Sequence, residues 1–385
     1  MANYKNIAAI ILAAGYSSRM SAFKPLLPMG KSTIINMTVN SFREAGIRNI
    51  TVVLGHRAFE LKPVLDRMKV HYVVNEEFDQ GMYSSVAAGV RVLGSDVEAA
   101  FIIPVDIPLV RSHTIHSLAK ELHNNSDVIY PVYQGKRGHP PLIRSIIFPE
   151  IITWSGHGGL RSLLSRYEVR ASEVGVWDEG ILKDADTPDD YQRILEDDWR
   201  GDIPTVSEAN ALLLDMGVPD AVRQHSLLVS RVAERLAVGL NHAGQGVLLD
   251  ISLVAMAGLL HDLAKGAPNH ANRGAKLLRK LGFPKVAKIV AAHTDIVFDD
   301  ESTVNEAAVV YLADKLVQGD RIVSIEERFC AAKQKFSDMS EAERVIAGRL
   351  LTARQIGRKV EQLLGAALEE VISSKTFNSA EKAGC

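Results

Sequence analysis

The sequence predicts two domains of different class: an α/β domain with a mostly parallel sheet, followed by an all-α domain. In the first half, short apolar runs rich in β-branched residues alternate with amphipathic stretches, which is the pattern of βαβ units. The second half almost lacks such runs, and its apolar residues recur at the three- and four-residue spacing of helices. The length of 385 residues also fits two domains.

The predicted elements follow in chain order. Strands are expected at residues 7–13, 50–54, 70–74, 99–104 and 128–131, and the helices between them at 33–45, 84–93 and 113–123. Helices of the second half are expected at 221–238, 252–264, 272–281, 285–292, 305–316 and 341–364. A polar stretch at 196–204 ends in a proline and marks the boundary, so we expect domains at 1–198 and 205–372 and a flexible polar tail at 373–385.

Composition excludes several classes of protein. Lys plus Arg is 44 and Asp plus Glu is 46, which gives a formal charge of −2 and disfavours a broad nucleic-acid interface. Two isolated cysteines, Cys330 and Cys385, make neither a disulfide framework nor a zinc knuckle. The first apolar run lacks a basic lead-in, and no run reaches the ~18 residues of a membrane span. We therefore expect a cytoplasmic protein without a membrane segment.

A loop of small residues follows the first predicted strand. Glycine and small side chains let backbone N–H groups approach a polyphosphate, and the nearby Arg19 and Lys24 can neutralise its charge. The loop contains neither the Walker A nor the GxGxxG pattern, so P-loop and dinucleotide sites lack their residues. An ordinary turn carrying two solvated bases is the alternative. The loop reads Leu12-Ala13-Ala14-Gly15-Tyr16-Ser17-Ser18-Arg19-Met20.

Two carboxylates are candidate metal ligands. Asp106 comes just after an apolar strand, at the sheet edge where open α/β folds bind ligands. Asp186 belongs to the acidic cluster at 183–190. Because Mg²⁺ favours one or two carboxylates plus substrate phosphates, the pair could hold such an ion. Asp186-Thr187-Pro188 would also suit a helix N-terminus.

Five motifs in order resemble the molybdenum-cofactor nucleotidyltransferases of the MobA-like family, across about residues 5–195. Besides the loop, they are Gly81-Met82-Tyr83-Ser84-Ser85, the PVDIP segment at 104–108, Gly138-His139-Pro140 and the DADTPDD segment at 184–190. The resemblance implies a Rossmann-like domain with Lys24 as a catalytic residue and Mg²⁺ on Asp106 and Asp186. Ser21 stands where the family usually has Gly. The nucleotide-binding residues it implies are Leu12, Ala13, Ala14, Gly15, Arg19, Lys24, Gly81, and Ser84 or Ser85.

The same resemblance implies transfer of a nucleotidyl group to an acceptor phosphate, with release of pyrophosphate. The LAAG loop with GMxSS is similar to the cytidylyltransferase branch, which implies CTP, molybdopterin and molybdoenzyme-maturation partners. Related folds act on sugar, alditol or choline phosphates. A sugar-, alditol- or choline-phosphate cytidylyltransferase whose helical half senses nucleotides or dimerises is therefore the alternative.

Six His and Asp residues stand out in the helical half. Adjacent His261 and Asp262 close an apolar stretch, where burial is costly unless something such as a metal satisfies them. Imidazole and carboxylate ligands suit Fe, Mn, Zn or Co. The complete set is His225, His261, Asp262, His270, His293 and Asp314.

The order H…HD…D resembles the HD phosphohydrolase superfamily over about residues 208–370. The resemblance implies a metal core of His225, His261, Asp262 and Asp314 that cleaves phosphoesters or pyrophosphates. His270 and His293 match the branch with two metals, which implies a dinuclear Fe/Mn site. Lys265 is a candidate catalytic phosphate contact, and a solvated lysine is the alternative. A CCA-adding enzyme also joins a transferase to an HD domain, but its transferase motifs differ.

Overall fold

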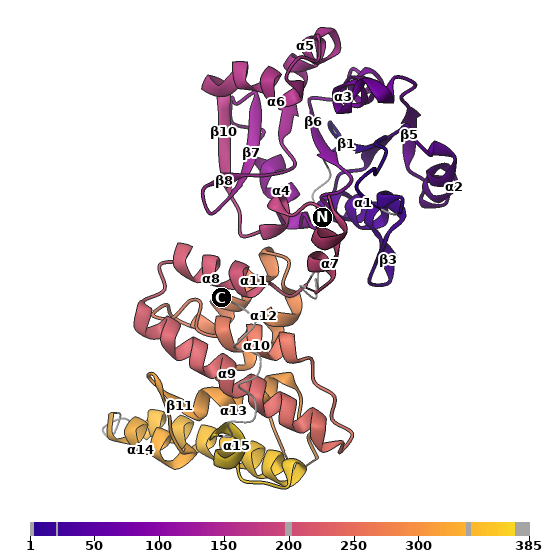
Figure 1. Ribbon diagram of the computed structural model, residues 1–385. Coiled ribbons are helices and arrows are strands. Elements are labelled where there is room, and N and C mark those ends of the chain that lie inside the picture. Colours follow the sequence, from indigo (N-terminus) through magenta and orange to yellow (C-terminus); the bar gives the residue numbers. More distant parts are fainter. Residues whose placement is uncertain (1–3, 21, 197–201, 300, 336–339, 374–385) are drawn as a thin grey trace. The chain divides into compact units, whose positions relative to one another are not determined.

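The chain divides into two compact units, Met1–Trp199 and Arg200–Cys385 (Figure 1). The computed structural model describes residues 4–20, 22–196, 202–299, 301–335 and 340–373. Residues 197–201 of the predicted linker and nearly all of the predicted tail lie outside the described residues.

The N-terminal unit is built on a sheet of eight strands in the order β10-β7-β9-β6-β1-β4-β5, with β8 paired to β7. Its pairs are parallel except those of β9, which lies between β6 and β7, and of β8. Leu12 of the central strand lies opposite Val53 and Pro104, so three parallel strands end at one edge. The strands are β1 (Ile7–Ala13), β4 (Asn49–Leu54), β5 (His71–Val74), β6 (Ala99–Pro104), β7 (Val128–Tyr133), β8 (Lys136–Arg137), β9 (Leu142–Arg144) and β10 (Ala171–Gly175).

Helices cover both faces of this sheet. Successive residues of a strand point to opposite faces. Ile102 packs in one apolar cluster with Val86 of α3, whereas its neighbour Phe101 lies 5.6 Å from the ring of Phe42 on α1. The helices are α1 (Ile34–Ala45), α2 (Ala58–Met68), α3 (Met82–Arg91), α4 (Ser112–Glu121), α5 (Phe148–Thr153), α6 (Gly159–Leu164) and α7 (Pro188–Glu196); the hairpin β2 (Pro28–Met29) and β3 (Ser32–Thr33) precedes α1.

The C-terminal unit is helical, as predicted, apart from the short hairpin β11 (Val317–Gln318) and β12 (Arg321–Ile322), which the sequence did not indicate. No helix among the residues that the structure describes is both long enough and apolar enough to cross a membrane. The helices are α8 (Val206–Asp215), α9 (Asp220–Ala243), α10 (Ile251–Leu260), α11 (His270–Lys280), α12 (Pro284–Ala292), α13 (Glu306–Lys315), α14 (Ile325–Lys335), α15 (Ser340–Leu364) and α16 (Leu368–Ser373).

Helix α10 is the centre of this unit and is buried on nearly every side. It crosses α9 closely, because a Cβ on Gly258 would lie 2.9 Å from Cα of Ser230. The hydroxyl of Ser230 also donates to the carbonyl of Ala255 at 2.8 Å. The predicted helix at 252–264 ends earlier, at Leu260, and His261 follows it as the C-cap. The C-terminal end of the buried helix α10 therefore places His261 and Asp262 in the core.

We expect limited proteolysis to cut first between residues 196 and 204, because this segment joins two compact units that each have a buried core of their own. Trypsin has a site there at Arg200. Mass spectrometry of a time course should give two fragments that resist further cutting, and Arg200→Gln should delay their appearance. First cuts inside residues 7–195 would contradict this boundary.

Candidate functional site

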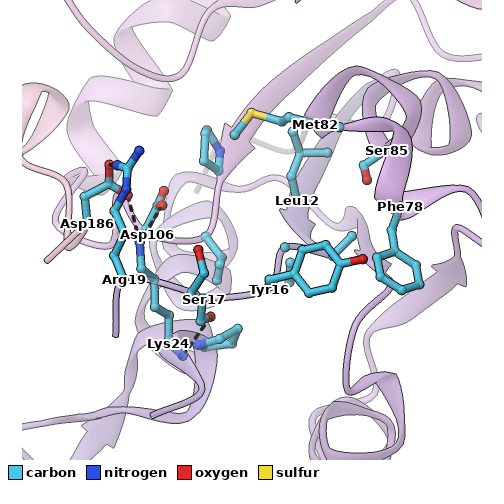
Figure 2. Close-up of a pocket in the computed structure, with 18 of the residues that line it drawn as sticks. Leu12, Tyr16, Ser17, Arg19, Lys24, Phe78, Met82, Ser85, Asp106 and Asp186 are labelled. Atoms are coloured by element: carbon cyan, nitrogen blue, oxygen red, sulfur yellow. Dashed lines mark hydrogen bonds and ion pairs between the residues drawn. The ribbon is translucent and has the colours of Figure 1, made fainter. Parts of the chain in front are cut away.

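A cleft of about 550 Å³ opens at the edge of the N-terminal sheet where β1 and β6 end (Figure 2). The loop after β1 forms one wall, and the segments that contain Asp106 and Asp186 contribute carboxylates to it. Its size lies in the range of small-molecule sites. The loop geometry depends on Ser17, which has φ of 54° and whose hydroxyl accepts the backbone N–H of Lys24 at 3.2 Å.

Lys24 links the two carboxylates at one end of the cleft. Its Nζ atom lies 2.7 Å from Oδ1 of Asp186 and 3.3 Å from Oδ2 of Asp106. Nη1 of Arg19 lies 2.8 Å from Oδ2 of Asp186. The side chain of Lys24 is 9% exposed and that of Arg19 is 70% exposed, so only the lysine is a buried charge that requires a partner.

The carboxylates differ in their electrostatics. Burial raises the pKa of Asp106, and the charge of Lys24 opposes that effect. The hydrogen bond from Lys24 lowers the pKa of Asp186 below its usual range. Two carboxylates that both reach one ammonium group are close enough to share a single cation. Their oxygens therefore fit a Mg²⁺ ion, which prefers one or two carboxylates together with substrate phosphates.

The structure brings nearly all of the predicted nucleotide residues to this cleft. The exception is Ser84, whose hydroxyl is 2.8 Å from the carbonyls of both Glu77 and Gly81 and does not line the cleft. The predicted residues that do line it are Leu12, Ala13, Ala14, Gly15, Arg19, Lys24, Gly81, Ser85, Asp106 and Asp186. The sequence did not indicate that Tyr16, Phe78 and Met82 line the cleft, because single aromatic or apolar side chains carry no spacing signal.

A second cleft, of about 590 Å³, adjoins the first and shares Leu12, Met82 and Pro104 with it. Two guanidinium groups line it, those of Arg137 and Arg161. Arg137 lies over the ring of a tyrosine and pairs with two glutamates. His139 of the predicted Gly-His-Pro motif also lines this cleft, and burial lowers its pKa. The remaining lining residues are Tyr83, Val86, Ile102, Tyr130, Gly138, Pro141, Gly158, Gly159, Leu160 and Leu164.

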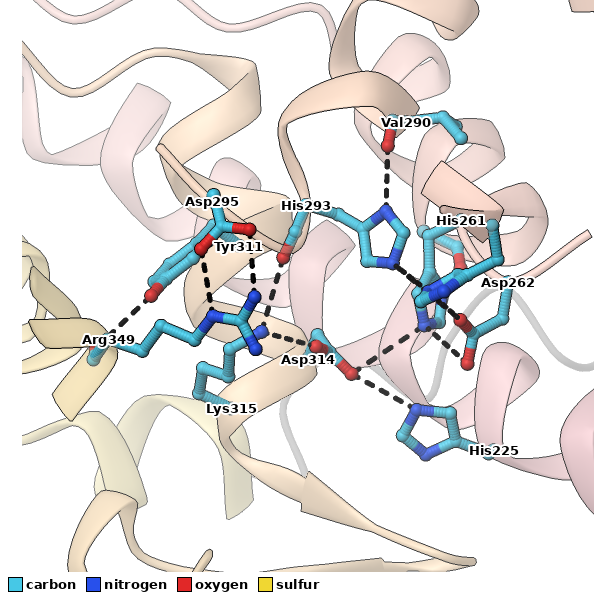
Figure 3. A network of polar contacts seen from close by, with 12 residues as sticks. His225, His261, Asp262, Val290, His293, Asp295, Tyr311, Asp314, Lys315 and Arg349 are labelled. Carbon is cyan, nitrogen blue, oxygen red and sulfur yellow. Dashed lines mark hydrogen bonds and ion pairs between the residues drawn. The ribbon is translucent and has the colours of Figure 1, made fainter. Parts of the chain in front are cut away.

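In the helical unit, three imidazoles converge on the buried carboxylate of Asp262 (Figure 3). Oδ1 of Asp262 lies 3.2 Å from Nε2 of His270 and 3.6 Å from Nε2 of His293. Oδ2 lies 3.3 Å from Nε2 of His261. Each oxygen of one carboxylate thus faces a different part of the cluster.

Asp314 supplies a second carboxylate from the end of α13. Its Oδ1 atom lies 3.2 Å from Nε2 of His225 and 3.6 Å from Nε2 of His261. Two groups can each hold a metal ion, and Asp262 belongs to both. Within each group the ligand atoms lie within 4.8 Å of one another, and the groups are His225, His261 and Asp262, and Asp262, His270 and His293. All six residues predicted from the sequence therefore meet in one cluster.

Backbone carbonyls fix the orientation of three of the imidazoles. A carbonyl only accepts hydrogen bonds, so each Nδ1 atom in contact with one carries the proton. In the neutral ring this leaves the Nε2 lone pair for a metal ion, the usual arrangement around metal-binding histidines. The pairs are His225 with Gly319 at 3.1 Å, His261 with Gly258 at 2.7 Å and His293 with Val290 at 2.7 Å.

Two buried polar atoms of this cluster favour the binding of a cation. Nε2 of His261 and Oδ1 of Asp262 are both buried, and their contacts at 3.2–3.6 Å within the cluster lack the geometry of hydrogen bonds. Burial disfavours the charged form of His261, but the carboxylates of Asp262 and Asp314 outweigh it and raise its pKa to about 9. A divalent ion would supply the positive charge that the proton otherwise provides. The cluster therefore fits transition-metal ions.

Two lysines flank the cluster. Nζ of Lys265 lies 2.8 Å from Oδ2 of Asp262, and its side chain is 48% exposed. The sequence did not single out Lys315, which is buried. Its Nζ atom lies 2.6 Å from Oδ2 of Asp314 and donates to the carbonyl of His293 at 3.2 Å. Lys315 thus leaves Oδ1 of Asp314 to face the histidines.

Comparison with known proteins supports two domain families. Residues 9–171 match the MobA-like NTP transferase domain, and residues 222–318 match the HD domain. The molybdenum cofactor cytidylyltransferase of Escherichia coli is 28% identical over 186 residues, 48% of this chain and 93% of that protein. Nicotine blue oxidoreductase of Paenarthrobacter nicotinovorans is 25% identical, over 49% of this chain and 96% of that protein. The crystal structure of Rv0371c from Mycobacterium tuberculosis has a TM-score of 0.46 and 26% identity, over 51% of this chain and 100% of that one.

We expect the chain to bind roughly two transition-metal ions, because two ligand groups share Asp262. A His270→Ala/His293→Ala double variant should retain about one ion, since the group of His225, His261 and Asp262 stays intact. Elemental analysis after loading with Mn²⁺ and desalting measures this. The control is His242→Ala, an exposed histidine near the end of α9. Two ions in the double variant with an unchanged circular dichroism spectrum would exclude the second group as a metal site.

Proposed function

We propose that this chain, which joins a MobA-like NTP transferase domain to an HD domain, is a bifunctional cytidylyltransferase and metal-dependent phosphohydrolase. The observation that carries the first activity is the cleft at the end of β1. A loop of small residues, two basic side chains and two carboxylates line that one cleft. These are the groups that transfer between phosphates requires, since positioning and charge neutralisation supply most of its catalysis.

In the proposed transfer, an oxygen of the acceptor phosphate forms a bond to the α-phosphorus of CTP. The bond from that phosphorus to the bridging oxygen breaks, and pyrophosphate leaves with the bonding electrons. Lys24 and Arg19 neutralise the charge of the phosphates, and Lys24 is already held at the carboxylates by its contacts with them. Asp106 and Asp186 would hold Mg²⁺, which neutralises further charge at the reacting phosphate.

The second cleft is the proposed site of the acceptor. It shares Leu12, Met82 and Pro104 with the nucleotide cleft, so an acceptor bound there lies next to the nucleotide. Arg161 suits a phosphorylated acceptor, because a guanidinium group matches the geometry of phosphate oxygens. Arg137 would have to exchange one of its two glutamate partners to bind the same phosphate. The Escherichia coli relative is a molybdenum cofactor cytidylyltransferase, which favours the molybdenum cofactor as that acceptor. The motif resemblance implies molybdopterin as the form of this acceptor and molybdoenzyme-maturation proteins as partners. Sugar, alditol and choline phosphates are the alternatives to test beside it.

The helical unit is the proposed hydrolase. The two ligand groups around Asp262 would hold Fe²⁺ or Mn²⁺ ions, which polarise a phosphate and lower the pKa of bound water. Lys265 is the proposed phosphate contact, because half of its side chain is exposed while its ammonium group stays beside Asp262. A phosphoester or phosphoanhydride is the substrate class that this arrangement suits. A unit that only senses nucleotides would not need both ligand groups.

We expect Asp106→Asn to lower pyrophosphate release by roughly 10²–10³-fold, the usual cost of removing a preorganised electrostatic contact. The substitution keeps the shape of the side chain and leaves Asp186 to pair with Lys24. Hydrolysis by the helical unit should remain. The matched variant is Asp262→Asn, which should abolish hydrolysis and spare the transfer. Pyrophosphate release by Asp106→Asn at the wild-type rate would rule out its role as a metal ligand.

We expect CTP to be preferred over GTP as the nucleotide substrate, because Ala14 and the Gly81–Ser85 segment are similar to the cytidylyltransferase branch. Steady-state kinetics with each NTP, Mg²⁺ and molybdopterin should give the higher kcat/KM for CTP. The same assay with sugar, alditol and choline phosphates identifies the acceptor class. A higher kcat/KM for GTP would contradict the proposed base specificity while leaving nucleotidyl transfer intact.

A further inference from the structure

Three aromatic side chains cluster beside the nucleotide cleft, each from a loop that follows a parallel strand. Tyr16 follows β1, His56 follows β4, and Phe78 lies in the segment after β5. The ring centroid of Tyr16 lies 4.9 Å from that of His56 and 5.4 Å from that of Phe78. Because the carboxyl ends of neighbouring parallel strands meet at one edge, the fold itself assembles these rings.

The loops that carry the rings are held tightly against one another. The backbone N–H of His56 donates to the carbonyl of Ala14 at 3.0 Å. A Cβ on Gly55 would lie 2.7 Å from Cβ of Phe78 and 2.8 Å from Cβ of Ala14, so only glycine allows this approach. The ring cluster is therefore preorganised before any ligand binds.

The buried residue Asn75 holds the segment that contains Phe78 in place. Its backbone N–H donates to the carbonyl of Leu54 at 2.8 Å, which ties the loop to the end of β4. Its Nδ2 atom donates to the hydroxyls of Ser84 at 2.8 Å and Ser85 at 3.0 Å. The segment that contains Phe78 is thus fixed at both ends.

The rings and the charged groups lie at opposite ends of the cleft (Figure 2). Tyr16 and Phe78 both line it, and Tyr16 is 52% exposed although it packs against two rings. Arg19, Lys24 and the two carboxylates lie at the other end. If the charged end receives the phosphates, the base of the same nucleotide reaches the aromatic end.

We propose that Tyr16 and Phe78 form a stacking surface for the nucleobase, which sets the affinity for nucleotides without selecting the base. This inference rests on the proposed nucleotidyltransferase function of the same cleft. Every base has a π-face, so stacking on aromatic rings is tolerant of base identity. Selection between bases then falls to polar groups that line the cleft, among them Asp79 and Ser85, whose hydroxyl accepts from Asn75.

The test is calorimetric titration of the full chain with CTP and with GTP in the presence of Mg²⁺ and without acceptor. Tyr16→Ala should weaken the binding of both nucleotides by a similar factor, roughly 5- to 150-fold. The affinity of Tyr16→Phe for either nucleotide should stay within about twofold of that of the wild type. Phe78→Leu keeps an apolar side chain without a π-face and should also weaken both. The matched control is Phe59→Ala, which removes a 73% exposed ring from α2, outside the cleft.

Inorganic tripolyphosphate separates stacking from a collapse of the phosphate loop, because it has no base. Its affinity should be the same for wild type and Tyr16→Ala. An equal loss of tripolyphosphate and CTP binding would overturn the stacking surface, as would unchanged CTP binding or a loss confined to one base. Wild-type protein that binds no nucleotide at all would instead refute the nucleotidyltransferase function.

Discussion

A charge taken out of water is stable in a protein only beside an opposite charge or a metal ion, and both units of this chain are organised around that constraint. In the N-terminal unit the buried Lys24 has two carboxylates around it. In the C-terminal unit the buried carboxylates of Asp262 and Asp314 have imidazoles and lysines around them. Each cluster holds groups from several elements in one place, and phosphate chemistry requires that placement.

The two clusters meet the constraint in different ways. The contacts of Lys24 can be exchanged, because a Mg²⁺ ion and phosphates would compete for the same charges, and the open cleft admits both. The imidazoles of the second cluster have fewer alternatives, because backbone carbonyls hold the Nδ1 atoms of His225, His261 and His293. The first arrangement suits a site that binds and releases a metal with its nucleotide. The second would suit a site that holds metal ions in a fixed arrangement.

Local sequence patterns predicted the central elements well and the peripheral ones poorly. All seven residues of β1 are buried, so the apolar run at 7–13 marks this strand without ambiguity. Helix α2 was not predicted, since Pro63 lies inside it and proline usually interrupts a helix. Strand β9 has three residues and exists only because β6 and β7 pair with it from either side. Such pairing depends on the sheet and leaves no periodic signal in the chain.

The sequence by itself determined the class of both domains and the identity of the charged residues, because apolar periodicity and short motifs are local properties. Only the tertiary structure decided which of those residues meet. Lys24 contacts carboxylates 82 and 162 positions away, and Asp262 is shared by two ligand groups. Phe78 joins Tyr16 only because β1, β4 and β5 end at the same edge. Contacts across such separations depend on how elements pack, and packing depends on the whole fold rather than on any one segment.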